Sequence, residues 1–347
     1  MQKTHSHYYV HLDFLRILSA VMVIAIHCLI TITDETPFTH AAAANIIHNI
    51  LNFSVPMFLI ITGGLLMSNE KEYTYKDMLK KYILRALLSI IVFGTAFALL
   101  ELVVTYRTVN LNILLTSVLY MLTGRSFDHM WYLYTLIGLY LITPVFKPFL
   151  KSAPKRRVEC FLLALFVVNY VFPCVNSIFD ISIAFTLPIT KWPIFYYIYG
   201  YYLMVHTADL KKAFPAVAVI IVSICCIAAL SVLGTADERF EPIAGQGSPF
   251  IIAIVTAVYL LARKHVTAPR KIYSLLSPLA LGIYIIHPVF IHIFRFAGIS
   301  ANEYPYLYPV LIAVVFVLAT AASYAMNAVL HFAMRQASKI LAKLRAR

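Results

Sequence analysis

Charged residues are scarce in this chain of 347 residues. Asp, Glu, Lys and Arg together make up 12% of the sequence, whereas hydrophobic residues make up 61%. Soluble domains carry about 25% charged residues, so this shortage excludes a water-soluble enzyme. Glycine, with 11 residues, and proline, with 16, are too rare for a collagen-like or a disordered low-complexity chain. The composition therefore predicts an all-α integral membrane protein that crosses the bilayer several times.

Cysteine is also rare. The chain has five, which is an odd number, and each lies in or at the end of an apolar run: Cys28, Cys160, Cys174, Cys225 and Cys226. We interpret them as small packing residues that are compatible with lipid, in preference to a disulfide framework or a thiol nucleophile.

Apolar runs of spanning length cover most of the chain. About 20 apolar residues cross the hydrocarbon core as a helix. This rule predicts ten transmembrane helices: 12–33, 43–67, 83–105, 129–146, 158–175, 192–206, 214–234, 249–263, 274–296 and 307–332. The apolar segment 111–123 is too short for a span and is expected to be interfacial or re-entrant. No signal peptide is expected, because the first apolar run is too long for one and no small-residue cleavage site follows it.

The 28 Lys and Arg residues are spread unevenly over the predicted loops. With a cytoplasmic start, most of them fall in inward-facing loops and at the two ends of the chain. This distribution follows the positive-inside rule and predicts that both termini are cytoplasmic. The net charge of +13 is then a consequence of topology, and no nucleic-acid partner is expected. We expect one membrane domain over residues 1–347, with a core at about 10–335 and a basic cytoplasmic tail at 336–347.

Ionisable side chains inside the predicted spans are the first candidates for a functional site, because they are costly in lipid. Arg16 and His27 are eleven residues apart in the first span, which is three helical turns plus about 20°, so they share one face about 16 Å apart. Ala20 and Val23 lie between them on that face, and a narrow groove is expected there. Asp13 precedes Arg16 by one turn, where its carboxylate could hold the guanidinium. The alternative is that Arg16 only snorkels to the headgroups and His27 makes an interhelical hydrogen bond.

Further polar residues occur in other predicted spans. They are His129, Glu101, His287 before the helix-kinking Pro288, and the pair His292 and Arg295. A cluster from several helices indicates a lined cavity. No zinc-binding spacing is present, and no metal is expected.

Basic residues also open the third span, at Lys80, Lys81 and Arg85. Positive-inside charge alone explains them, but together with Arg16 they could bind a phosphate-rich cofactor. His5, His7 and His11 are expected to belong to a solvated tail.

Five segments together resemble the membrane acyltransferase-3 family. The R-x10-H arrangement of the family's first helix is matched by Arg16 and His27, and the pattern V-P-x-F…S-G-x-L-L by VPMFLIITGGLL, with Thr62 in place of serine. HMWYLYTLIGLYLITP, FYYIYGYYL and LSPLALGIYIIHP are similar to later family segments. His287, His292 and Arg295 are similar to the enterobacterial common antigen O-acetyltransferase branch. Lys80, Lys81 and Arg85 stand where many members have R-x-x-R.

The resemblance implies an O-acyltransferase, acting with acetyl groups, in the bacterial inner membrane. Cytoplasmic acetyl-CoA (or another acyl-CoA) would be the donor substrate, and a hydroxyl of an extracytoplasmic glycan or lipid-linked sugar the acceptor. The donor's phosphates would meet Arg16, Lys80, Lys81 and Arg85, and its pantetheine arm would pass Ala20 and Val23. The candidate catalytic residues are His27 as general base, with His129, His287 and Glu101.

Several alternatives stay open from the sequence. Direct transfer and an acetyl-histidine intermediate are both compatible with it, and the acceptor and the acyl length are not determined. The chain is compatible with a homodimer. The main alternative function is a transporter of small solutes or lipid intermediates that uses His27 and Glu101 for proton coupling.

Overall fold

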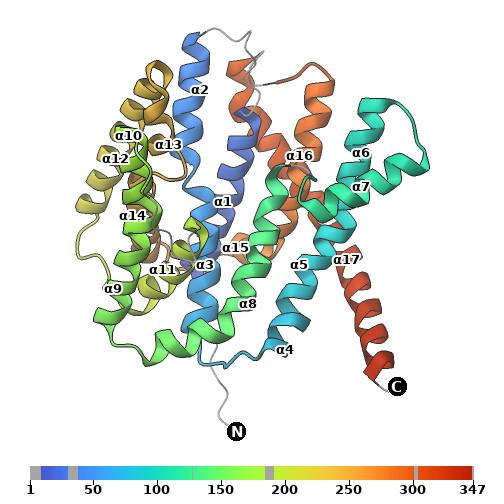
Figure 1. Ribbon diagram of the computed structural model, residues 1–347, viewed down its shortest axis with the longest axis horizontal. Coiled ribbons are helices and arrows are strands. Elements are labelled where there is room, and N and C mark those ends of the chain that lie inside the picture. Colours follow the sequence, from blue (N-terminus) through green and yellow to red (C-terminus); the bar gives the residue numbers. More distant parts are fainter. Residues whose placement is uncertain (1–8, 30–37, 127, 184–190, 301–303, 346–347) are drawn as a thin grey trace. The chain divides into compact units, whose positions relative to one another are not determined.

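The computed structural model describes residues 9–29, 38–126, 128–183, 191–300 and 304–345. This part of the chain is built from helices joined by short connections and contains no β-strand (Figure 1). The predicted all-α class is therefore confirmed.

Most of the helical elements join into continuous segments that are long enough to span a membrane. Within the described residues, nine helical segments are long and apolar enough to cross a bilayer: Val10–Leu29, Ala42–Ser68, Tyr75–Tyr106, Trp131–Ser152, Lys155–Phe179, Phe214–Ala236, Glu238–His265, Lys271–Phe296 and Pro305–Gln336. They correspond to nine of the ten predicted spans, which makes this a multi-pass membrane protein. The tenth, predicted at 192–206, is a helix of 14 residues, about 21 Å long, against a hydrocarbon core of about 30 Å. The segment 111–123 is a helix of 13 residues, as short as predicted.

Two compact units make up the chain, and each combines two stretches of sequence. The first unit consists of residues 1–68 and 153–320, and the second of residues 69–152 and 321–347.

The helices of the first unit alternate between long and short elements. They are α1 (Val10–Leu29), α2 (Phe38–Leu51), α3 (Ser54–Ser68), α9 (Lys155–Phe166), η4 (Val167–Val171), α10 (Phe172–Phe179), α11 (Trp192–Val205), α12 (Phe214–Ala236), η5 (Glu238–Phe240), α13 (Glu241–Ala244), α14 (Pro249–His265), α15 (Lys271–Leu276), η6 (Ser277–Leu279), α16 (Ala280–Phe296), η7 (Pro305–Leu307) and the first part of α17 (Tyr308–Arg345).

The second unit has fewer elements. They are α4 (Tyr75–Asp77), η1 (Met78–Ile83), α5 (Leu84–Ser89), η2 (Ile90–Gly94), α6 (Thr95–Tyr106), α7 (Leu111–Thr123), η3 (Asp128–Met130), α8 (Trp131–Ser152) and the remainder of α17.

Helices α3 and α11 of the first unit cross with their backbones in direct contact. A Cβ atom added to Gly63 would lie 1.9 Å from the carbonyl oxygen of Tyr197, and one added to Gly200 would lie 2.1 Å from that of Ile60. Only glycine allows two helices to approach so closely. Most of α3 is buried, so this crossing lies in the interior of the unit and explains the glycines in VPMFLIITGGLL and FYYIYGYYL.

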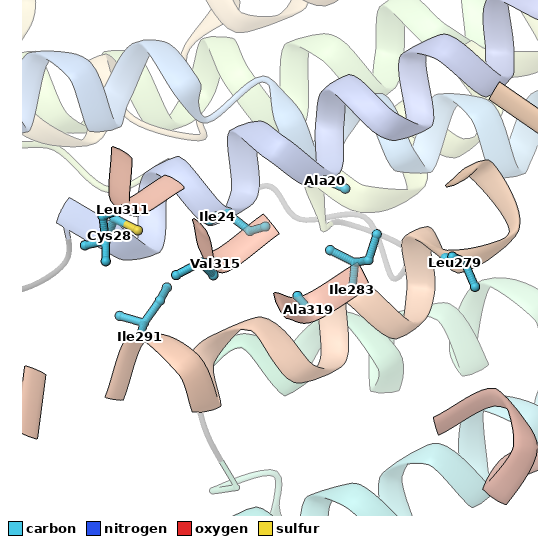
Figure 2. Close-up of a cluster of buried hydrophobic side chains, with 9 residues drawn as sticks. All are labelled: Ala20, Ile24, Cys28, Leu279, Ile283, Ile291, Leu311, Val315 and Ala319. Carbon is cyan, nitrogen blue, oxygen red and sulfur yellow. The ribbon is translucent and has the colours of Figure 1, made fainter. Parts of the chain in front are cut away.

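A second apolar core joins α1 to α16 and α17. Figure 2 shows Ala20, Ile24 and Cys28 of α1 facing side chains of η6, α16 and α17: Leu279, Ile283, Ile291, Leu311, Val315 and Ala319. The residue numbers rise together along α1 and α16 and run in the opposite direction along α17. Helix α1 is therefore parallel to α16 and antiparallel to α17. All five cysteines are free thiols; Cys28 is packed in this core, whereas Cys160 and Cys225 are exposed.

Local signals fix the ends of the helices in the second unit. Thr74 and Asp77 form a capping box, in which the hydroxyl of Thr74 accepts from the backbone N–H of Asp77 at 3.2 Å. The continuous helix that starts there ends at Arg107, which is left-handed with φ 50°. The side chain of Asn110 caps α7, which ends at Gly124 with φ 73°. The third predicted span therefore begins at 75, not at 83, and Lys80 and Lys81 lie within it.

Arg263 closes the carboxyl end of α11 in the first unit. Its Nη1 donates to the carbonyl of Leu203 at 3.0 Å, its Nη2 to that of Ala208 at 2.5 Å, and its Nε pairs with Asp209 at 2.8 Å. A cation satisfies the free carbonyls that every helix leaves at this end. This residue, predicted only as positive-inside charge, therefore also has a structural role.

We predict that Gly63→Ala destabilises the protein by about 1–3 kcal/mol or prevents its folding, because the new methyl group would overlap the backbone of α11. Thermal unfolding of purified protein in detergent measures the effect. Gly138→Ala in α8 is the matched control, since a Cβ there meets nothing within 4 Å. Equal melting temperatures for Gly63→Ala and wild type would contradict the close crossing.

Candidate functional site

Helix α1 carries three of the polar residues that the sequence singles out as candidates for a functional site. Asp13, Arg16 and His27 lie on the continuous helix Val10–Leu29, as predicted. Ala20 and Val23, between them, are each only 1% exposed, and Ala20 belongs to the core shared with α16. The predicted groove beside these two residues is wrong, because small side chains let the neighbouring helix approach instead of leaving a channel.

Near the start of α1, Arg16 is held by two oxygen atoms. Its Nη1 donates to Oδ1 of Asp13 at 3.1 Å and to Oγ of Ser277 at 3.2 Å. The hydroxyl of Ser277 in turn donates to the same Oδ1 of Asp13 at 2.5 Å. The predicted role of Asp13 in holding Arg16 is confirmed. Ser277, which joins the two from a segment 261 residues away, was not predicted.

Near the other end of α1, the imidazoles of His27 and His287 meet. Their ring centroids are 4.8 Å apart, with an angle of 68° between the ring planes. His287 is completely buried and His27 is half-buried. The structure therefore brings together two of the histidines that the sequence singled out from separate spans.

The ring nitrogens of these histidines have defined roles. Nδ1 of His27 lies 2.8 Å from the carbonyl oxygen of Val23, and Nδ1 of His287 lies 2.8 Å from that of Tyr284. A carbonyl oxygen can only accept a hydrogen bond, so each Nδ1 carries the proton in the neutral imidazole. Nε2 is then the basic nitrogen of each ring.

Pro288 leaves one of the two carbonyls near Nδ1 of His287, that of Tyr284, without its usual backbone donor; the other, that of Ile283, lies 3.2 Å away. In a regular helix the N–H of residue 288 would donate to the carbonyl of Tyr284, but proline has no N–H. The Nδ1–H of His287 donates to that carbonyl instead. Helix α16 continues from Ala280 to Phe296 with Pro288 inside it, so the His-Pro pair orients an imidazole without ending the helix.

Arg295 lies near the contact between His27 and His287, at the carboxyl end of α1. Its Nη2 is 3.4 Å from the carbonyl oxygen of His27, where a cation is favourable because α1 ends two residues later. Tyr308 donates to the neighbouring carbonyl of Ala25 at 3.1 Å. His292, predicted together with Arg295, is exposed.

The parallel packing of α1 and α16 aligns the Arg16–Ser277 contact at one end with the His27–His287 contact at the other. Arg16 and His27 are about 16 Å apart along α1, and Ser277 and His287 are about 15 Å apart along their own segment. Because these lengths agree, contact at one end brings the residues at the other end into register. The apolar core in Figure 2 fills the space between them.

The other candidate residues belong to the second unit. His129 is 3% exposed, and its ring centroid is 6.5 Å from that of Phe97. Glu101, Lys80 and Lys81 are exposed. Arg85 is half-buried and donates to Oδ1 of Asn327 at 3.3 Å.

Metal ligands do not gather in the described part of the chain, where no group of three His, Cys, Asp or Glu residues is placed to hold an ion. The prediction that His11 lies in a solvated tail is wrong. It belongs to the first turn of α1, is 8% exposed, and makes edge contacts with Tyr9 and Tyr259. His5 and His7 lie outside the described residues.

Lys147 is a buried cation that directly follows the predicted span 129–146, so the sequence predicted it as positive charge of an inward-facing loop. It is 3% exposed, its Nζ donates to Oδ1 of Asn69 at 2.7 Å, and it lies 4.5 Å from the ring centroid of Tyr73. Burial, together with a hydrogen bond to Tyr82, raises the pKa of Tyr73 to about 12, so this ring is a neutral phenol. The available sequence signal is the set of apolar residues on both sides of Lys147, which the structure places inside α8.

We predict that Asn69→Ala lowers the free energy of unfolding by about 1.5–3 kcal/mol, because it removes the oxygen that accepts from the buried ammonium group. Adding Lys147→Met should restore part of this loss, since the charge is then gone. Asn112→Ala, at an exposed position on α7, is the control. Unfolding of the four variants in detergent measures the effects, and an unchanged stability in Asn69→Ala would contradict this role.

The sequence was compared with protein families, curated proteins and solved structures. The model of the acyltransferase domain of the acyltransferase-3 family matches residues 9–328. No curated protein and no solved structure matches the chain. The match is to the family as a whole and supports no particular branch, but it includes α1, α16 and every candidate residue described above. The chain therefore belongs to the acyltransferase-3 family of membrane acyltransferases.

Proposed function

We propose that this protein transfers an acetyl group from cytoplasmic acetyl-CoA to a hydroxyl group of an extracytoplasmic or lipid-linked sugar. The observation that carries the proposal is the contact between the imidazoles of His27 and His287. They lie on two parallel helices whose other polar contact holds Arg16. Membership of the acyltransferase-3 family supports acyl transfer, whereas the donor, the acetyl group and the residue roles belong to this proposal.

His27 is the proposed general base. Its Nδ1–H donates to the carbonyl of Val23, which leaves Nε2 to take a proton from the acceptor hydroxyl. Imidazole suits this role because its unperturbed pKa lies near neutral pH. His287 is fixed in the same tautomer and contacts the His27 ring, so its proposed role is to orient that ring or to stabilise the oxyanion.

The proposed reaction is a direct transfer. Nε2 of His27 takes the hydroxyl proton while the hydroxyl oxygen forms a bond to the thioester carbonyl carbon. The carbon–sulfur bond then breaks, and the imidazolium of His27 returns the proton to the leaving thiolate. The products are an O-acetyl ester and free CoA.

Arg16 is the proposed binding residue for the phosphate groups of the donor, because a guanidinium forms strong charge-assisted hydrogen bonds with phosphate. Lys80, Lys81 and Arg85 were predicted from the sequence to share this role. They belong to the second unit, and their role stays a prediction, as do the catalytic roles of His129 and Glu101.

The proposed location is the bacterial inner membrane, with both termini in the cytoplasm, an orientation that requires the short helix α11 to cross the bilayer together with the nine longer spans. The excess of Lys and Arg in the predicted inner loops supports this orientation. Arg16 then lies toward the cytoplasmic side, where acetyl-CoA is found, and His27 toward the opposite side. An acceptor like that of the enterobacterial common antigen branch is compatible with this orientation.

We predict that the purified protein binds acetyl-CoA saturably and hydrolyses it slowly in detergent. Arg16→Ala should weaken binding at least tenfold, because a charge-assisted hydrogen bond contributes about 1.5–3 kcal/mol. His27→Ala should keep binding but lose turnover by roughly 100-fold or more, as expected for a general base. Calorimetry and thiol release measure the two effects.

Two controls make this experiment decisive. Arg156→Ala, at an exposed position on α9, should leave both quantities unchanged, and a melting curve for each variant establishes that it is folded. A folded wild-type protein with neither binding nor turnover would overturn the proposal and favour the transporter alternative, which flux measurements in vesicles would then test.

The His-Pro pair generates a separate prediction. Pro288→Ala returns a backbone N–H to the carbonyl of Tyr284, where it competes with Nδ1 of His287. We expect kcat to fall severalfold while KM for acetyl-CoA stays unchanged, since the His287 ring then keeps only its longer contact, 3.2 Å, with the carbonyl of Ile283 and is less firmly oriented. Equal decreases in kcat for Pro288→Ala and Pro278→Ala, which also replaces a helical proline, would indicate a general structural effect.

A further inference from the structure

Ser277 makes two hydrogen bonds with the charged pair on α1. Its hydroxyl donates to Oδ1 of Asp13 at 2.5 Å and accepts from Nη1 of Arg16 at 3.2 Å. Arg16 donates to the same carboxylate oxygen at 3.1 Å, so three hydrogen bonds close a triangle. Ser277 is 6% exposed and lies in η6, between α15 and α16, whereas the other two residues lie on α1.

The two charged side chains of this triangle differ in exposure to solvent, and the difference suits a role of Arg16 in binding. The side chain of Asp13 is 11% exposed, whereas that of Arg16 is 30% exposed. The anionic side of the contact is thus shielded by protein, and the cationic side is reachable. The hydrogen bonds to Asp13 and Ser277 both use one nitrogen of Arg16, Nη1, so these two partners fix the guanidinium at the same atom.

Holding an arginine in this way affects how strongly it binds an anion. A free arginine side chain has considerable rotamer entropy, part of which is lost when it binds a ligand. A guanidinium that is already fixed loses less, so its affinity for phosphate is higher. Asp13 lies one turn away on the same helix and contacts Arg16 through one carboxylate oxygen. Ser277 approaches from a separate segment and adds a second contact at the same nitrogen.

We propose that Ser277 is a positioning residue that presents Arg16 to the phosphate groups of the acyl donor. This inference rests on the proposed function, and it assigns to the α15–α16 junction a part in donor recognition. The same continuous segment carries His287, ten residues further on. Donor binding at one end of α1 and the histidine pair at the other therefore both depend on how this segment packs against α1.

A purely structural role for Ser277 makes a different prediction. If the triangle only fixes α1 to the α15–α16 junction, loss of the hydroxyl should lower stability and reduce kcat and donor affinity together. If Ser277 acts through Arg16, its loss should weaken donor binding in particular. The effect should also depend on the presence of the arginine.

A double-mutant cycle in the full-length protein in detergent tests this inference. Acetyl-CoA affinity is measured for wild type, Ser277→Ala, Arg16→Lys and the double variant, together with KM and kcat for thioester hydrolysis. We expect Ser277→Ala to weaken binding roughly tenfold in wild type, with kcat changed less than twofold. In the Arg16→Lys background, whose ammonium lacks the planar fork, the same change should have less than a twofold effect.

Three further variants complete the experiment. Ser277→Thr keeps the hydroxyl and should restore wild-type affinity. Ser277→Cys keeps the volume with a weak donor, and replaces the alanine variant if that one does not fold. Ser117→Ala removes a buried hydroxyl that donates to the carbonyl of Leu114 in its own helix, and should not change affinity.

The outcomes separate the inference from the function on which it rests. Equal effects of Ser277→Ala in the two backgrounds, or unchanged donor affinity, would overturn the positioning role while wild-type turnover still supports the enzyme. A wild-type protein that is folded but binds no acetyl-CoA would overturn the proposed donor, and this inference with it.

Discussion

The parallel packing of α1 against α16 is the interaction on which the candidate site depends. Polar contacts lie at both ends of this pair: Arg16 meets Ser277 at one, and His27 meets His287 at the other. Small and branched apolar side chains fill the interval (Figure 2). In lipid, such packing replaces the hydrophobic effect as the force between helices, and it leaves little freedom for one helix to slide along the other. A change in register at either end would therefore separate the residues at the other.

Backbone groups, more than side-chain partners, determine the chemistry of the histidine pair. Both imidazoles donate from Nδ1 to carbonyls of their own helices, so Nε2 is the basic atom in each. For His287 the carbonyl is available because Pro288 has no N–H to offer it. A residue that would normally disturb a helix thus leaves a carbonyl oxygen that helps to orient the imidazole of its neighbour. The glycines of α3 and α11 act in a comparable way, since the absence of a Cβ at Gly63 and Gly200 permits the central crossing.

Some predictions from the sequence were wrong for identifiable physical reasons. Small residues at Ala20 and Val23 indicated a groove, but in the folded protein they are buried, because a small side chain permits either an open channel or close packing. His11 was expected in a solvated tail, yet the first turn of α1 buries it beside Tyr259. Lys147 was assigned to loop charge, although Asn69 and Tyr73 enclose it. In each case the neighbour that decides the outcome lies on another segment.

The sequence by itself determined the membrane class, the approximate helices, the shared face of Arg16 and His27, and the family. These depend on composition, on the 3.6-residue period and on short motifs, all of which are local along the chain. The pairing of His27 with His287 and the hydrogen bonds of Ser277 to Asp13 and Arg16 were decided only by the tertiary structure. They join residues about 260 positions apart, and side chains on different helices meet only when the packing of the whole unit sets which faces touch.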